Sequence, residues 1–197
     1  YRLGWPGLTG FTYVLPFNSR EALVEFTLFS PKLLQDGDYE QMLRRYIPEI
    51  LGSGEFEILE TEYGVIPMSD FPFERYSQGR HVRIGTAGGW VKPSSGYSFK
   101  NCERNSLKII ENMKAGRLAQ QGLISKKYRF YDSVFLEVLH KNNERGAEIF
   151  QAMYLKNEAP EIFRFLDEQT SLSDELRIIR SFPVPLFLRA LLRYLFR

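Results

Sequence analysis

The chain has 197 residues, of which 44% are hydrophobic and 15% aromatic, and its formal net charge is +2. This length allows one full hydrophobic core or two small ones, and the near-neutral charge gives no reason to expect a nucleic-acid partner. A single cysteine excludes an internal disulfide and is typical of a reducing compartment; with only two histidines besides, we expect no metal site.

The amino end carries no sign of a targeting signal. Residues 1–5 lack the basic start and the apolar run of a signal peptide, and the first residue is not Met. We therefore expect a cytoplasmic protein, and we expect this chain to begin inside a longer one.

The first elements are two predicted strands, residues 11–17 and 22–30, joined by a turn at 18–21. Strand alternation places Glu25 on one face with apolar neighbours rather than with other charges. Two interpretations stay open: an edge-strand carboxylate that reaches water, which the residues alone favour, or an acid held in apolar surroundings.

A helix is predicted from Asp38 to Leu51, kinked or split at Pro48 and ended by glycine. Residues 56–62 alternate as a third strand and continue in an extended segment. A polar and aromatic connection, residues 69–80, then leads to the most distinctive stretch of the chain.

That stretch is a glycine-rich turn between a strand and a helix. His81–Ile84 predicts a short buried strand that ends in glycines, and Pro-Ser-Ser-Gly at 93–96 opens a long helix that ends by Gly116. Glycines let the backbone approach a ligand, and the start of a helix offers unpaired N–H groups to an anion. The residues that recur at helical spacing in this stretch are Phe99, Cys102, Ser106, Ile109, Ile110 and Met113.

The rest of the chain is predicted to be helical. Helices are expected to begin at Arg129, to cover 146–154 and 161–168, and to follow a capping box at 171–174. The final run is too short and too interrupted to span a bilayer. In it Arg189, Arg193 and Arg197 form one basic stripe on an apolar helix. This helix either lies in a membrane interface or is buried with only the arginine stripe exposed to solvent.

Three separated blocks resemble the lycopene cyclases. They are residues 13–27, residues 62–68 and residues 85–98, and two later segments, 129–133 and 165–168, resemble the tails of bacterial members. The resemblance covers nearly the whole chain in the right order. It implies an α+β fold, the carboxyl-terminal part of a flavoprotein built like the aromatic hydroxylases. The expected regions are a substrate-binding region (1–80), a flavin-docking strand–turn–helix (81–116) and a helical carboxyl-terminal region (117–197).

The family resemblance implies an enzyme, an isomerase of the intramolecular lyase type, that converts linear lycopene to cyclic carotene with reduced FAD and without net redox change. Protonation of an end double bond gives a carbocation, ring closure follows, and loss of a proton completes the reaction. Such chemistry needs a proton donor in an apolar slot, an anion near the cation and the exclusion of water.

Several residues acquire roles through the resemblance. Glu25 falls on the acidic position of the family's strand motif, where many members have two adjacent acids and this chain has Phe26 second. Glu62 would be the second carboxylate, and burial among aromatic rings would raise the pKa of such acids. The flavin-contacting residues implied are Gly85, Thr86, Gly88, Gly89, Pro93, Gly96 and Tyr97. Thr86 stands where the wider flavoprotein group usually has Asp.

One departure from the family is the lack of a Gly-x-Gly-x-x-Gly dinucleotide-binding motif, since the glycines at 4, 7 and 10 have the wrong spacing. We therefore expect this chain alone to hold FAD poorly and to be inactive. The partners expected are lycopene or another carotenoid and a membrane surface, with peripheral membrane association.

Two other functions remain open. An FAD-dependent reductase or hydroxylase acting on an isoprenoid would use the same turn, and a non-enzymatic membrane or lipid-binding module would need only the apolar tail. Glu25 and Glu62 favour the cyclase, because hydride transfer needs no paired acids.

Overall fold

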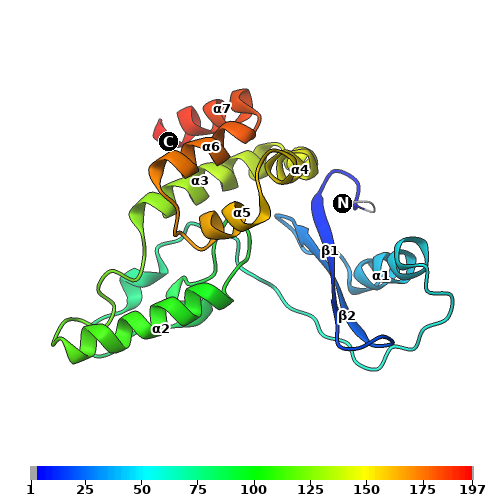
Figure 1. Ribbon diagram of the computed structural model, residues 1–197, viewed down its shortest axis with the longest axis horizontal. Coiled ribbons are helices and arrows are strands. Elements are labelled where there is room, and N and C mark those ends of the chain that lie inside the picture. Colours follow the sequence, from blue (N-terminus) through cyan, green and yellow to red (C-terminus); the bar gives the residue numbers. More distant parts are fainter. Residues whose placement is uncertain (1–3, 197) are drawn as a thin grey trace. The chain divides into compact units, whose positions relative to one another are not determined.

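The computed structural model describes residues 4–196; residues 1–3, part of the amino end discussed above, and Arg197 lie outside the described residues. Contacts divide the chain into two compact units. The first comprises the chain up to Gly64 with Leu139–Phe150, and the second comprises Val65–Val138 with the chain from Gln151. The described residues form seven α-helices and one two-stranded antiparallel sheet, which confirms the α+β class (Figure 1).

The first unit is built on the predicted hairpin. Strands β1 (Thr9–Pro16) and β2 (Ala22–Phe29) pair in antiparallel register, with Tyr13 opposite Glu25. The turn is local in origin, because the side-chain oxygen of Asn18 accepts hydrogen bonds from the backbone N–H groups of Arg20 and Glu21.

Helix α1 (Asp36–Leu51) lies beside the hairpin in the first unit (Figure 1). It confirms the predicted helix, and Pro48 does not split it. The helix ends at Gly52, whose φ of 70° is left-handed, as helix ends commonly require. Contact with β2 comes through Phe26, whose ring centroid is 6.5 Å from that of Tyr39.

Hydrogen bonds from a short helix hold the end of the hairpin that lies away from its turn. Asn143, in the short 3₁₀ helix η3 (Asn143–Arg145), accepts from the Thr9 N–H at 2.5 Å and donates to the Phe29 carbonyl at 2.8 Å. Gly146 begins α4 (Gly146–Lys156) so close to β1 that a Cβ there would lie 1.7 Å from the Thr9 hydroxyl. Glycine at this position is therefore required by packing.

Two predicted strands are wrong. Residues 56–62 run without regular secondary structure, because no neighbouring strand pairs with them and alternation alone does not make a strand. His81–Ile84 is not a buried strand: His81 forms a single bridge with Gln78, and Ile84 is exposed. A tight turn uses these residues instead, with the Ser77 hydroxyl accepting from the Arg83 N–H.

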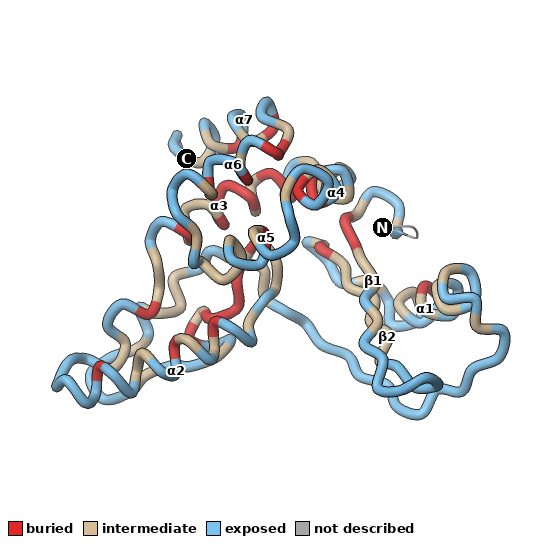
Figure 2. The backbone as a smooth tube through the Cα atoms, viewed as in Figure 1, coloured by how far each residue is buried: buried red, intermediate tan, exposed pale blue. Residues whose placement is uncertain are grey.

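The second unit contains the glycine-rich turn and most of the helices. Its further elements are η1 (Phe73–Tyr76), η2 (Gly85–Gly88), α2 (Phe99–Lys114), α3 (Lys126–Lys141), α5 (Ala159–Leu166), α6 (Leu172–Ser181) and α7 (Val184–Leu195). Buried residues concentrate on α3 and the elements that cover it (Figure 2). Among them the stacked rings of Phe182 and Phe187, 4.7 Å apart, both contact Phe135. The cap before α6 is confirmed in its N-cap half, since the Ser171 side chain accepts from the Asp174 N–H.

Helix α2 confirms the predicted helix, but its buried positions are polar and do not coincide with the residues whose spacing predicted it. The residues that the helix buries are Asn101, Asn105 and Asn112, whereas Phe99 is 77% exposed and Met113 65% exposed. Polar contacts explain the burial of Asn101 and Asn112, because buried amides must be hydrogen-bonded and both find backbone partners. Asn101 donates to the Trp90 carbonyl, and Asn112 donates to the carbonyls of residues 119 and 121.

Helix α7 has one side that packs against the protein and another that is exposed and apolar. Leu186 and Ala190 are buried, so one side packs against the protein. Another side leaves apolar residues exposed next to Arg189 and Arg193; these residues are Val184, Leu188, Leu192 and Leu195. Within residues 4–196, no helix has both the length and the apolar character needed to cross a bilayer.

Candidate functional site

The first candidate site is the glycine-rich turn in the second unit. It closes on itself, since the Lys92 N–H donates to the Tyr97 carbonyl at 2.7 Å and the Gly96 N–H donates to the Lys92 carbonyl at 2.8 Å. Gly89 and Gly96 have φ values of 73° and 76°, which side-chain-bearing residues rarely adopt. The turn therefore needs glycine at both positions for its backbone.

The predicted turn residues differ in what surrounds them. Gly88 is buried, and a Cβ there would lie 2.3 Å from the Arg83 carbonyl oxygen. A Cβ added at Gly96 would make ordinary van der Waals contacts, with Met68 at 3.8 Å and Ile66 at 3.9 Å. Thr86 and Tyr97 are exposed, and Gly85, Gly89 and Pro93 are half-buried. The turn thus has one side fixed by packing and another side open.

Helix α2 begins directly after the turn. Its N-cap residue, Ser98, makes no side-chain capping hydrogen bond, and its first helical residue, Phe99, is exposed. The first N–H groups of a helix have no partner within the helix and carry the positive end of its dipole. The open side of the turn therefore ends in backbone donors.

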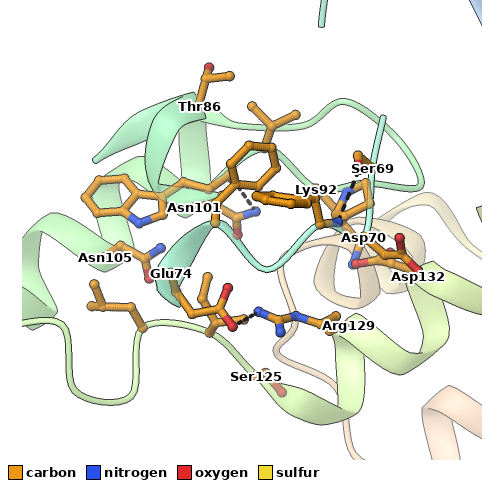
Figure 3. A pocket seen from close by; sticks show the side chains of 18 of the residues that line it. Ser69, Asp70, Glu74, Thr86, Lys92, Asn101, Asn105, Ser125, Arg129 and Asp132 are labelled. Atoms are coloured by element: carbon orange, nitrogen blue, oxygen red, sulfur yellow. Dashed lines mark hydrogen bonds and ion pairs between the residues drawn. The ribbon is translucent and has the colours of Figure 1, made fainter. Parts of the chain in front are cut away.

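Behind the turn lies a cavity of about 50 Å³ (Figure 3). Ligand pockets commonly measure roughly 300–1,000 Å³, so this one suits water-sized species rather than a flavin ring. Glu74 and Arg129 form an ion pair at its wall, drawn as a dashed line in Figure 3. The rest of its lining comes from the turn, from α2 and α3, and from the connection before the turn.

A buried charge network fixes the packed side of the turn. The Lys92 ammonium lies 3.0 Å from the Asp132 carboxylate of α3 and 3.7 Å from that of Glu168. Asp132 also accepts a hydrogen bond from the Ser94 hydroxyl, and Glu168 pairs with Arg104 at 3.2 Å. The network thus joins the turn to α2, α3 and the end of α5.

Glu168 has an unusual backbone conformation and a raised carboxyl pKa. Its φ of 61° is left-handed, and among the described residues other than glycine it alone has a positive φ. Burial raises the pKa of its carboxyl, against the opposing charges of Lys92 and Arg104. Sequence reasoning missed this network, because Lys92 and Asp132 lie 40 positions apart and no spacing rule connects them.

The second candidate site is a pair of carboxylates in the first unit. Glu25 on β2 lies next to Glu62, which follows α1 in the extended segment. Glu25 is half-buried, but Glu62 is exposed, so the expected burial among aromatic rings is wrong for Glu62, because no element of the described chain covers this segment there. Desolvation raises the pKa of Glu25 to about 7, and the hydrogen bond to Glu62 and the charge of Glu62 add to the shift. The structure thus brings together the two acids that the resemblance singled out. A carboxyl group with this pKa is half protonated at neutral pH and can donate a proton.

A third acid, Glu175, shows what a structural carboxylate looks like in the same molecule. It is fully buried and accepts from Lys127 at 2.6 Å, Tyr128 at 2.7 Å and Tyr131 at 3.0 Å. Burial alone would raise its pKa, but these hydrogen bonds outweigh burial and the pKa is lowered. Glu175 therefore stays ionised and ties α6 to α3.

No group of three or more His, Cys, Asp or Glu side chains able to hold a metal ion occurs within residues 4–196. Comparison with curated proteins and with solved structures found no match. The family model described as "Lycopene cyclase protein" matches residues 3–192, almost the whole chain. The resemblance inferred from the three blocks is thereby confirmed, and the chain belongs to the lycopene cyclase family.

Proposed function

We propose that this protein cyclises the ends of linear lycopene by acid–base chemistry, with Glu25 as the proton donor. One arrangement carries the proposal: Glu25 lies next to Glu62 and directly across the hairpin from Tyr13, and desolvation together with Glu62 raises the pKa of Glu25 to about 7. An ordinary glutamate, with a pKa near 4.5, would almost always be ionised at neutral pH. The shift keeps a usable fraction of Glu25 protonated.

The two acids have different parts in the proposed reaction. Protonated Glu25 transfers its proton to a terminal carbon–carbon double bond, whose π electrons form the new C–H bond and leave a cation beside it. Glu62 lies next to Glu25, where a second carboxylate would place negative charge near the cation. Ring closure consumes another double bond, and loss of a proton to a carboxylate restores neutrality.

We also propose that FAD binds at the open side of the glycine-rich turn. Two features of that turn support the fit: the exposed Thr86 and Tyr97, and the uncapped start of α2. The half-buried Gly85, Gly89 and Pro93 would contact the group from the turn, and Gly88 lets the turn form. When bound, reduced FAD would supply negative charge, which the start of α2 stabilises.

The substrate is a hydrocarbon, and α7 is the element best suited to meet a membrane. Its exposed apolar residues lie beside Arg189 and Arg193, the arrangement that places a helix at headgroup depth. We propose that α7 rests on an anionic membrane surface while its other side stays packed through Leu186 and Ala190.

Pigment analysis tests the catalytic proposal. The native protein is expressed in cells that accumulate lycopene, and the carotenoids are separated and identified. Wild-type protein should yield cyclic carotene, whereas Glu25→Gln, which keeps the shape but not the acid, should yield linear lycopene. Glu60→Gln is the matched control, because Glu60 is exposed in the same extended segment as Glu62. Cyclic product at the parental level from Glu25→Gln contradicts the role of Glu25.

A further inference from the structure

The face of the hairpin that carries Glu25 also carries a row of aromatic rings. In antiparallel strands, residues that face each other across the pair point to the same side of the sheet. Tyr13 is opposite Glu25, and Phe11 is opposite Thr27, the next residue on that face. Phe29, two positions further along β2, completes the row on this side. We call Phe29, Phe11 and Tyr13 the aromatic row.

The rings of the aromatic row follow one another at contact distance. The Phe11 centroid lies 6.0 Å from that of Phe29 and 6.2 Å from that of Tyr13. Both separations lie within the range of interacting aromatic pairs. The row is closed at one end, where Phe29 is 7% exposed, and open at the other, where Tyr13 is 36% exposed.

Glu25 lies at the open end of the row. Directly opposed residues have Cβ atoms about 4.5–5.5 Å apart, so the Tyr13 ring is an immediate neighbour of the Glu25 carboxyl. Beyond Tyr13 the same face continues with Leu15 opposite Leu23. The hairpin's other face is already used, since Phe26 packs on Tyr39 of α1. Apart from Thr9, Thr27 and Glu25 itself, the residues of this face are therefore apolar or aromatic.

We propose that the aromatic row seats the end of the linear polyene and that the Tyr13 ring stabilises the cation formed when Glu25 transfers its proton. This inference rests on the proposed cyclase function and names further residues for it. The faces of aromatic rings carry partial negative charge and attract cations, most strongly where water is excluded. The rings also match a flat, conjugated hydrocarbon, which offers no group for hydrogen bonding. Glu25 loses the proton and becomes a carboxylate, and the cation remains between that charge and the ring.

Substitutions at position 13 distinguish the effect of the aromatic ring from the effects of the hydroxyl group and of side-chain volume. Tyr13→Phe keeps the ring, Tyr13→Leu keeps only apolar bulk, and pentafluorophenylalanine at this position keeps the shape but removes the negative ring face. In native protein with lycopene, we expect Tyr13→Phe to retain the parental kcat. The other two should lower kcat about tenfold with little change in KM, the effect expected for the loss of a partly desolvated cation–ring contact.

Phe17→Leu is the matched control, because Phe17 is an exposed ring on the same hairpin beyond the end of β1. Melting curves show whether each variant is folded. If Tyr13→Leu does not fold, the fluorinated variant still tests the inference, because its side chain keeps the shape of the ring. A parental kcat in the fluorinated variant overturns the inference, as does a loss in Tyr13→Phe equal to that in Tyr13→Leu. If Glu25→Gln is inactive while the Tyr13 series is unaffected, the inference alone fails. If Glu25→Gln remains active, the proposed function itself fails.

Discussion

Replacing Asp132 by Asn should destabilise the second unit strongly. The Lys92 and Asp132 side chains are only 2% and 5% exposed, so the lysine cannot regain water when its partner loses charge. Breaking a buried ion pair by removing one partner costs about 3–5 kcal/mol. Glu168 remains 3.7 Å from the ammonium and Asn can still accept from Ser94, which places the expected loss at the low end, about 3 kcal/mol.

Urea unfolding at neutral pH measures this loss, and thermal melting gives a second reading. A change of this size corresponds to a decrease in Tm of about 6–12 °C for a chain of this length. Glu40→Gln is the matched control, because Glu40 pairs with Arg44 at 2.7 Å on the exposed surface of α1. That substitution should cost no more than about 0.5 kcal/mol.

A second substitution tests the physical reason. If the cost of Asp132→Asn comes from an unpaired buried ammonium, then adding Lys92→Met should recover most of the lost stability, because buried ion pairs are often replaceable by apolar residues of similar volume. A loss below about 1 kcal/mol in Asp132→Asn, or no recovery in the double variant, would show that the pair is not energetically buried.

Three further predictions concern the proposed function. Because the raised pKa keeps Glu25 protonated below about 7, cyclisation should decline as pH rises through 7. Glu62→Gln should move this decline to lower pH by removing the negative charge that adds to desolvation, and an unmoved pH profile contradicts the coupling. Gly96→Val should abolish FAD retention, because a φ of 76° is incompatible with a branched side chain. Undiminished flavin absorbance in the purified Gly96→Val variant of the native protein would disprove the role of the turn. Changing Arg189 and Arg193 together to Gln should release the protein from anionic vesicles at low salt, since each arginine contributes about 1 kcal/mol; neutral vesicles are the control, and wild-type protein that never co-sediments at any salt rules out this surface.

The pH shift also affects stability. Since the pKa of Glu25 is raised in the folded state, its contribution is fully present below the unfolded value of about 4.5 and is lost as pH rises through about 7. Glu25→Gln should therefore flatten the pH dependence of unfolding in that window, even where activity cannot be measured. Titration of unfolding free energy by urea at several pH values measures it, and an unchanged slope would show that Glu25 does not titrate there.

Elements with local causes were predictable from the sequence. The hairpin follows from alternation and from the Asn18 turn, and α6 follows from a cap formed by Ser171 within the same four residues. Helix α1 was predicted almost to its ends, because Gly52 stops it locally. Each of these features depends on residues only a few positions apart, which is the range that periodicity and turn chemistry describe.

Features with distant causes were not predictable in the same way. The buried side of α2 was missed because the Asn101 amide finds its acceptor on Trp90, outside the helix, and periodicity counts asparagine as a surface residue. Likewise, the Lys92–Asp132 contact exists only after α3 has packed on the turn. The pairing of Glu25 with Glu62 came from family resemblance, since nothing in their spacing brings residues 25 and 62 together.

The backbone of Glu168 has a consequence for how sequences of this family vary. Residue 168 follows α5 in the left-handed conformation, where glycine is the usual choice and any other residue carries a strain of roughly 1–3 kcal/mol. In this chain the glutamate carboxylate at that position pairs with Lys92 and Arg104, which offsets the strain. Relatives with glycine at this position should therefore also have lost one of those two cations, so that the three positions change together across the family.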